Sequence, residues 1–435
     1  MKRFLSLLLI SSFMLVILSA CAAPNDEATP GADAQEQLTL WDVIVRTPHP
    51  EARDMVIAAF LEENPHVSME VSTLTGDINQ VILTAAAGNT LPDVVFVWGP
   101  GDVITWGQMG IIAPVDNIVD YFGRDWWLSQ RQLEMYQMDG HTWGVPIVSF
   151  PIVFWYRADW FNEAGLAVPT TWDEWYNAAV ALTDRDANRF GSVFGIAEGW
   201  PWHDLRGSNA DYWWDRDGNI TIDSRSVETL DFLRRMFDET AYPGSVAFTN
   251  EGQRVGFLSD MGATMVTSVS FVNTIMEEVG LEWFTEGIIG VAPVPMNATP
   301  EQGAGAGAAT HAIGLIDGPN LELAETFLRF WLSEDSLVTY FSNNIPGHLP
   351  PYRVVWNSPQ FRNAHADYWE VYGAGYEIIA TTQWFHPPVG WEAIFNADGG
   401  GGAQVMSAVT IERIPSADIV SNLIAIAENA RAEIE

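Results

Sequence analysis

Short apolar runs alternate with longer amphipathic runs in the first hundred residues after the N-terminal region. The runs 38–42, 67–71 and 93–98 are short and rich in β-branched or aromatic residues, which is typical of strands. The segments 50–64 and 78–87 carry apolar residues at helical spacing. Strands that alternate with helices usually pair in parallel and are covered on both faces. The pattern therefore predicts an α/β fold.

The middle of the chain changes style around a long apolar run at residues 147–156. Pro151 stands in its centre, and proline is poorly tolerated in a central strand because it lacks an N–H donor. We therefore expect a bend between two sheets at this point. Thr171 and Glu174 form a capping box that opens a helix. Further strands are expected at 288–295 and 312–316, and further helices at 227–239, 321–333 and 417–433.

The N-terminal region has the pattern of a secretory signal. Lys2 and Arg3 precede the apolar stretch 4–18, and Cys21, the only cysteine, follows Leu-Ser-Ala. This predicts a signal peptide at 1–20, with a retained anchor helix as the alternative. The Leu-Ser-Ala-Cys sequence resembles a bacterial lipobox, which implies that Cys21 is lipidated and becomes the mature N-terminus. Residues 21–37 are small and polar and predict a flexible tether.

Charge and cysteine content exclude several classes of protein. Lys and Arg number 20 against 56 Asp and Glu, a net charge of −36, so we expect no nucleic-acid partner. One cysteine makes no internal disulfide and no thiolate zinc site. After the signal, no run reaches the roughly 18 apolar residues that cross a bilayer.

Twenty tryptophans suggest aromatic contact with a ligand as well as packing. Trp41 and Trp98 stand where predicted strands end. Ligands of open α/β sheets bind at the carboxyl ends of the strands, in pockets of apolar walls and sparse polar groups. Because sugars combine apolar C–H faces with hydroxyls, a pocket with aromatic walls and a few polar groups suits a carbohydrate.

Signals for a metal, a cofactor or catalysis are weak, and none of the three is expected. The segment 215–219 hints at a calcium loop, but Ile220 and Ser226 replace the required glycine and glutamate, so a hairpin turn is favoured. The glycine-rich stretch 303–307 precedes a strand and does not join a strand to a helix, unlike a dinucleotide loop. His311 lies in an apolar strand, which favours a hydrogen-bonded core histidine.

Several short motifs resemble, in order and spacing, one bacterial protein family. They are AAGN before LPDV (86–94), GIIAPVD (110–116), DGHTWGVP (139–146), WYRADWF (155–161) and PTTWDE (169–174). Together they resemble the extracellular solute-binding proteins of ABC importers, in particular the sugar-binding, maltodextrin-binding-like branch. The resemblance implies a periplasmic-binding-protein-like fold: two α/β lobes, a three-crossing hinge and an interlobe ligand cleft.

The same resemblance implies where the lobes and hinge lie. The crossings are expected near Ser149–Val153, Ala292–Met296 and Gly347–Arg353. Lobe one is then 38–150 plus 295–347, and lobe two is 151–294 plus 348–435. On this division Trp126 and Trp127 are expected on a surface helix of lobe one, away from the ligand.

Matching the family position by position implies a set of cleft residues. Trp41 joins this set because it stands at the end of a predicted strand. The expected ligand-binding residues are then Trp41, Arg46, Trp98, Asp102, Phe150, Trp200, Trp202, Ser268, Ser270, Phe271 and Trp391. Two positions depart from the maltodextrin pattern. Phe150 replaces a glutamate, and the segment 200–202 replaces Glu-Pro-Tyr by Trp-Pro-Trp. These departures remove two carboxylate acceptors and add apolar area, which implies that the ligand is an oligosaccharide or glycoside with more hydrophobic faces than maltodextrin.

The resemblance implies a substrate-binding lipoprotein that captures a carbohydrate and delivers it to ABC permease subunits. It is expected to be a monomer without enzymatic activity, anchored through Cys21 outside a bacterial cell membrane. A tethered glycan hydrolase is the alternative, and it requires two carboxylates roughly 5–10 Å apart. A polyamine- or cation-binding protein is another, and it requires an acid-lined aromatic box.

Overall fold

The computed structural model describes residues 36–44, 48–76, 78–212, 219–299, 308–344, 346–381 and 401–434. The predicted signal peptide, the tether with Cys21, Arg46, Trp391 and nearly all of the calcium-like segment lie outside these residues. Within the described residues, no helix is long and apolar enough to span a bilayer.

Strands from the first 157 residues, together with one strand from residues 308–316, build a sheet that we call the sheet of lobe one. Its strand order is β2-β1-β3-β10-β7. The strands are β1 (Glu36–Asp42), β2 (Val67–Thr73), β3 (Val94–Val97), β10 (Ala308–Ile316) and the first half of β7 (Val145–Arg157), with the short β4 (Ile112–Ala113) beside β10. The first three pair in parallel, as the alternating pattern predicts, whereas β10 runs antiparallel to both neighbours.

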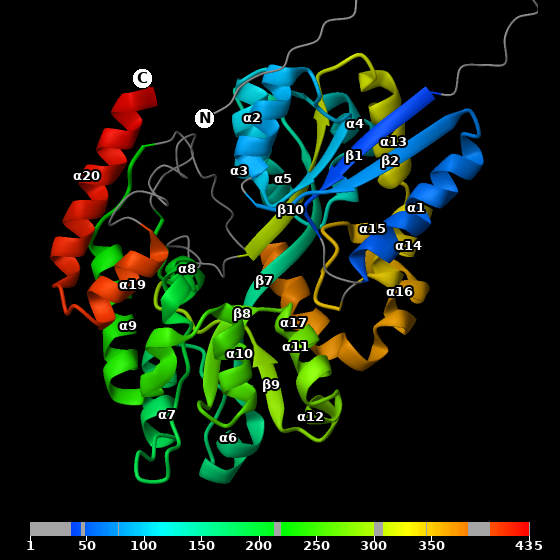
Figure 1. The fold of residues 1–435 in the computed structure, drawn as a ribbon. Coiled ribbons are helices and arrows are strands. Elements are labelled where there is room, and N and C mark those ends of the chain that lie inside the picture. The colour runs from blue at the N-terminus through cyan, green and yellow to red at the C-terminus, as the bar shows by residue number, and fades with distance from the viewer. Residues whose placement is uncertain are drawn as a thin grey trace, which may run out of the picture.

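Helices cover this sheet, and its core is strongly aromatic (Figure 1). The helices of lobe one are α1 (His49–Glu63), α2 (Ile78–Gly88), α3 (Pro100–Gln108), α4 (Asp116–Phe122), α5 (Gln130–Glu134), α13 (Leu321–Trp331) and α14 (Glu334–Asn343). Phe60 of α1 meets Phe327 of α13 edge to face, with ring centroids 5.2 Å apart. Phe96 of β3 meets Trp331 in the same way at 4.9 Å. Such pairs fix α1 and α13 on one face of the sheet.

Strand β7 continues into a second sheet, the sheet of lobe two. Up to Pro151 it pairs with β10, and from Ile152 it pairs with β8 (Thr264–Ser268) and β9 (Ile289–Ala292). Pro151 marks the residue where β7 changes partners, and its carbonyl accepts the N–H of Val269. The missing N–H of proline is tolerated because the ladder is interrupted there.

Lobe two surrounds the second sheet with helices from two parts of the chain. They are α6 (Ala158–Ala164), α7 (Trp172–Ala181), α8 (Trp200–Arg206), α9 (Ser224–Thr240), α10 (Asn250–Leu258), α11 (Phe271–Glu278), α12 (Glu282–Thr285), α19 (Gly402–Thr410) and α20 (Ser416–Ile434). The predicted capping box of α7 is confirmed, with reciprocal hydrogen bonds between Thr171 and Glu174. Figure 1 shows α19 and α20 beside α9.

Two of the predicted crossings differ from the packing. Met296 still exchanges backbone hydrogen bonds with Thr170 and Trp172 of lobe two, so the chain leaves that lobe after 298 and not at 292–296. After Leu349, which pairs with Ser149, the chain turns back onto lobe one.

There α15 (Arg353–Asn357) and α16 (Pro359–Ala364) lie against α14, before α17 (Trp369–Thr381) reaches β7 and β9 (Figure 1). The Phe341 ring of α14 contacts both Tyr352 and Phe361. Residues 353–364 therefore pack on lobe one, although the sequence division assigned them to lobe two.

The expected surface position of Trp127 is wrong. Arg124–Trp126 form a single 3-10 turn, and Trp127 then extends into the core, where it forms a bridge with Tyr352 and packs on its ring. Trp127 is fully buried, and only Trp126 keeps partial exposure. Adjacent residues point to opposite sides once the helix ends, which the sequence pattern alone did not show.

Candidate functional site

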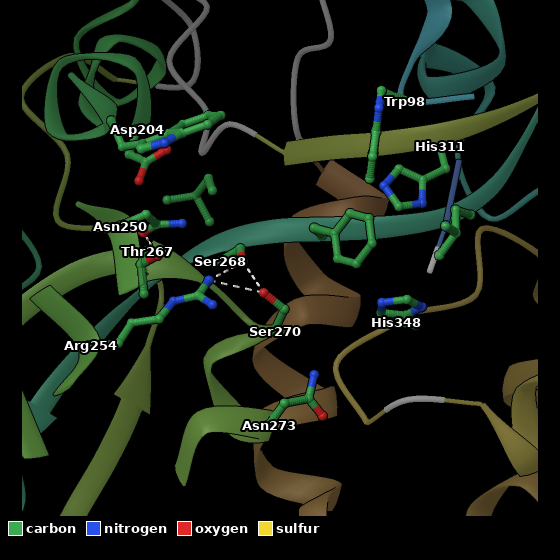
Figure 2. Close-up of a pocket in the computed structure, with 14 residues that line it drawn as sticks. Trp98, Asp204, Asn250, Arg254, Thr267, Ser268, Ser270, Asn273, His311 and His348 are labelled. Atoms are coloured by element: carbon green, nitrogen blue, oxygen red, sulfur yellow. Dashed lines mark hydrogen bonds between the residues drawn. The ribbon is translucent and has the colours of Figure 1, made fainter. Parts of the chain in front are cut away.

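A cavity of about 330 Å³ lies where β7 passes between the two lobes. The described residues that line it are Ile44, Trp98, Phe150, Ile152, Trp200, Asp204, Asn250, Arg254, Thr267, Ser268, Ser270, Asn273, His311 and His348. Figure 2 shows Trp98, His311 and His348 facing Asp204, Asn250, Arg254 and Ser270 across the cavity. We call these two sides the lobe-one wall and the lobe-two wall.

The lobe-one wall is a chain of rings. Trp98 follows β3 directly, and its ring centroid lies 5.0 Å from that of His311 on the neighbouring strand β10. The Phe150 ring of β7 packs on both His311 and His348, with ring centroids 4.7 Å apart in each pair. Trp98 is 51 % exposed, which is unusual for so large an apolar side chain. The wall therefore presents an open aromatic face supported from behind by packed rings.

His311 adds a polar atom to this aromatic wall. Burial lowers the pKa of His311 to about 3, helped by the nearby charge of His49, so the imidazole is neutral. Its Nδ1 is buried and has no hydrogen-bond partner within the described residues. The expected hydrogen-bonded core histidine is thus corrected to a cavity-lining one whose ring nitrogen is unused.

The lobe-two wall is polar and centred on Arg254 of α10. Its Nη2 donates to Ser268 Oγ (3.2 Å) and Ser270 Oγ (3.0 Å), and these two hydroxyl oxygens lie 2.6 Å apart (Figure 2). Its Nη1 donates to Glu251 Oε2 at 3.3 Å, outside the cavity lining. Because Ser268 ends β8 and Ser270 precedes α11, the strand-to-helix turn places both hydroxyls at the cavity.

Two asparagines extend the polar wall on either side. Asn250 Oδ1 accepts hydrogen bonds from Gln253 Nε2 (2.8 Å) and Thr267 Oγ1 (3.1 Å), which leaves its amide N–H₂ group unused within the described residues. The Asn273 side chain makes no hydrogen bond within them, although only 6 % of the residue is exposed. Buried amides are nearly always hydrogen-bonded in native proteins, so this wall is prepared for a polar ligand.

Asp204 supplies the only carboxyl among the described residues that line the cavity. It lies on α8, one turn after Trp200, and is only 5 % exposed. Burial raises its pKa well above the usual range, and the positive charge of Arg254 opposes this shift only in part. Its carboxyl has no hydrogen-bond partner within the described residues, so it can bind the donors of a ligand.

Of the residues expected from sequence, Trp98, Phe150, Trp200, Ser268 and Ser270 meet in this one cavity. Trp41 and Asp102 are half-buried on lobe one and are not part of its lining. Arg46 and Trp391 lie outside the described residues. For none of these residues does the geometry by itself establish contact with a ligand, and that role stays a prediction.

The expected positions of Trp202 and Phe271 at the cavity surface are corrected. Both are fully buried. Trp202 lies two residues after Trp200 in α8, about 200° around the helix, so it faces the core when Trp200 faces the cavity. Phe271 packs edge to face on Trp155, with ring centroids 5.0 Å apart. Among the described residues, the lobe-two wall therefore has one tryptophan and not two.

Sequence reasoning missed most of the polar wall. Asn250, Arg254, Thr267 and Asn273 look like ordinary surface residues of their helices and strand. The spacing of Asp204 gave a usable signal, because it stands four residues after Trp200 and so shares its helix face. It also returns a carboxyl to a region that the sequence comparison described as losing one.

Comparison with known proteins places the chain in context. The family model described as bacterial extracellular solute-binding protein matches residues 47–337, more than half of the chain. An uncharacterized ABC transporter extracellular-binding protein of Pyrococcus horikoshii is 24% identical over 195 residues, 43% of this chain and 44% of that protein. This match therefore spans less than half of the Pyrococcus protein.

Two further relatives have named ligands. An arabinooligosaccharide-binding protein of Halalkalibacterium halodurans is 22% identical over 323 residues, 69% of this chain and 67% of that protein. The GacH receptor of Streptomyces glaucescens, whose crystal structures include a complex with acarbose, superposes with a TM-score of 0.71. It is 20% identical, and the match covers 91% of this chain and 99% of the receptor. At this identity the likeness establishes a shared fold.

Proposed function

The chain belongs to the family of bacterial extracellular solute-binding proteins, and on this premise we propose that it captures a carbohydrate for an ABC importer. The named ligands of the relatives, arabinooligosaccharide and acarbose, are both glycans and support this ligand class. Delivery to membrane permease subunits follows from the role of the family.

The observation that carries the proposal is the unlike character of the two cavity walls. One is an aromatic face made of Trp98, Phe150 and two histidine rings, and the other is a row of hydroxyl, amide, guanidinium and carboxyl groups. A sugar ring has the same two aspects, because its C–H faces are apolar and its hydroxyl rim is polar. Stacking on one lobe and hydrogen bonding to the other would hold the ligand between the lobes and favour closure.

The cavity favours neither a glycan hydrolase nor a polyamine- or cation-binding protein. A hydrolase would need two carboxyl groups flanking the bond to be cleaved, and Asp204 is the single carboxyl among the described lining residues. A cation site would need an acidic lining, whereas Arg254 places a positive charge at the cavity. We therefore propose that the protein binds its glycan without turnover.

We also propose that the protein is a monomer held at the outer face of the membrane by a lipid on Cys21. The support for the anchor is the sequence pattern of basic start, short apolar core and Leu-Ser-Ala-Cys. A Cys21→Ser variant expressed in bacteria should leave the membrane fraction with its fold intact, as judged by circular dichroism. A serine variant that still fractionates as a lipoprotein would contradict the anchor.

A glycan-library thermal-shift screen tests the ligand class directly. A ligand that binds only the folded state at 100 times its Kd stabilises by about 2.7 kcal/mol, which raises Tm measurably. We expect several oligosaccharides to raise Tm, with spermidine as the cation control giving no shift. Incubation of the best glycan with purified protein should return it uncut by chromatography. Release of smaller sugars would favour the hydrolase.

A further inference from the structure

We propose that the glycan carries a carboxylate, and that Arg254, Ser270 and Asn273 on the lobe-two wall form the subsite that holds it. The inference rests on the proposed function, since it specifies which glycans the same cavity takes. The ligand class is then a uronic-acid-containing sugar: C–H faces and hydroxyls like any glycan, with one acidic group.

The first argument is the charge of the cavity. The chain has 56 acidic residues against 20 Lys and Arg, yet the described lining contains one carboxyl and one guanidinium. The residue Arg254 is only 5 % exposed, so its charge is poorly solvated and faces the ligand space. Glu251 compensates this charge from outside the cavity and the two serines from within it, and a ligand carboxylate would add a charged partner on the cavity side.

The second argument is a count of hydrogen atoms at the two serines. Each hydroxyl has one hydrogen to donate and can accept two. Ser268 and Ser270 both accept from Arg254, and one of them donates to the other. One hydroxyl hydrogen is then left over and is available to an acceptor in the cavity. The serine pair therefore presents a donor to the ligand, as the guanidinium does.

The third argument is that the amides add further donors. The Asn250 carbonyl is occupied by Gln253 and Thr267, so the group that remains for a ligand is its N–H₂. Figure 2 shows the amide nitrogen of Asn273 directed toward Ser270. Among the described residues of this wall, Asp204 is the only carboxyl. A sugar hydroxyl accepts hydrogen bonds but also has a hydrogen to donate, whereas an ionised carboxylate only accepts and carries a charge opposite to that of Arg254, so a wall rich in donors matches an acid best.

The local helix geometry agrees with an acceptor at this place. Ser270 stands at the N-cap position of α11, but its side chain makes no capping hydrogen bond and is engaged by Arg254 instead. The positive end of the helix dipole therefore adds to the charge of Arg254 near Ser270 and Asn273. Asp204 lies one turn after Trp200 on α8, where its carboxyl can accept hydrogen bonds from the ring hydroxyls of the same sugar.

Matched sugar pairs test the inference. Cellobiose, maltose and laminaribiose are each compared by calorimetry with the counterpart in which one C6 hydroxymethyl group is oxidised to a carboxylate. We expect at least one uronate to bind at least tenfold more tightly than its neutral parent at low ionic strength. The ratio should fall as salt is added, because salt screens charge attraction.

Variants locate the effect within the wall. Arg254→Gln should bring the uronate-to-neutral affinity ratio close to one. Since removing a buried arginine can unfold a protein, Asn273→Asp serves as a second variant, which places a negative charge at the subsite while Arg254 remains. It should lower uronate affinity at least tenfold. Arg185→Gln, which removes an arginine bound to backbone carbonyls on the exposed surface of lobe two, is the control and should keep the wild-type ratio.

The outcomes separate this inference from the proposed function. Wild-type protein that binds neutral parents as tightly as every uronate would overturn the carboxylate subsite and leave carbohydrate capture standing. A uronate preference that survives both Arg254→Gln and Asn273→Asp would also overturn it. If no neutral or acidic sugar binds at all, carbohydrate capture itself fails.

Discussion

Asp42 and Asp204 are two buried aspartates, one in each lobe, with opposite surroundings. Asp42 Oδ1 accepts the N–H of Ile44 (2.8 Å), and its Oδ2 accepts from Arg53 (2.6 Å) and contacts His49 Nε2 (2.8 Å). Burial alone would raise the pKa of Asp42, but His49, Ile44 and Arg53 together hold it below its usual value. Asp204 has no such partners within the described residues, and burial raises its pKa.

The difference distinguishes a carboxyl that serves the fold from one that is available to a ligand. The hydrogen bonds of the Asp42 carboxylate are all made by the chain itself. The other ring nitrogen of its partner His49, Nδ1, lies 2.7 Å from the Tyr340 hydroxyl, so the network is closed. It fixes the chain just after β1, where Ile44 enters the cavity lining. Asp204 faces that cavity from the other side, and its carboxyl has no hydrogen-bond partner in the part of the chain that the structure describes. Its burial costs stability that a bound ligand can return.

The largest effect is expected from breaking the closed network. Asp42→Asn removes the buried carboxylate partner of Arg53 and leaves only the exposed Asp54, and loss of one partner of a buried pair commonly costs about 3–5 kcal/mol of unfolding free energy. Chemical denaturation at pH 7 measures it. Asp54→Asn, which removes the exposed partner of the same arginine, is the control and should cost less than about 1 kcal/mol.

The cost of Asp42→Asn should depend on pH in a definite direction. A carboxyl with a lowered pKa stabilises the fold above its unfolded pKa of about 3.9, and the benefit is lost as pH falls through the lower folded value. The difference between wild type and variant should therefore shrink in acid. A difference that grows below pH 4 would contradict this account of Asp42.

A smaller effect is expected at the aromatic wall. Trp98→Ala removes the exposed ring that we expect to stack on the sugar, and truncating an aromatic anchor commonly costs ~2 kcal/mol or more, about thirtyfold in affinity. Stability should change little, because half of Trp98 is already in water. Trp126→Ala is the control, since Trp126 lies off the cavity. Equal affinity for both variants would place the ligand elsewhere.

The smallest effect concerns the open carboxyl. The folded protein holds a proton on Asp204 more readily than the unfolded chain, so its stability falls as pH rises between the two pKa values. Asp204→Asn should therefore raise Tm at pH 8, with about 1.4 kcal/mol for each unit of pKa shift, and raise it less at pH 4. Affinity for the glycan should fall in the same variant. A stabilised variant with full affinity would assign Asp204 no part in binding.

Local patterns in the sequence were sufficient for much of the secondary structure and for part of the site. Alternating apolar runs gave the parallel strands β1, β2 and β3 and the helices between them, because periodicity reports which residues leave water. The capping box at Thr171 and the strand end at Trp98 were likewise local. The family resemblance, confirmed by the match over 47–337, supplied the two-lobed fold.

Tertiary structure alone decided which side chains share the cavity. Residue 98 follows β3, and residues 204, 254 and 311 lie on α8, α10 and β10, so no sequence spacing joins them. It also decided that Trp127, Trp202 and Phe271 lie in the core. The sequence does not distinguish an aromatic side chain that packs in the core from one that faces the cavity or the solvent. Arg254 and Asn273 resembled solvated surface residues. Burial and unused hydrogen-bonding groups single them out, and both are properties of packing between distant segments.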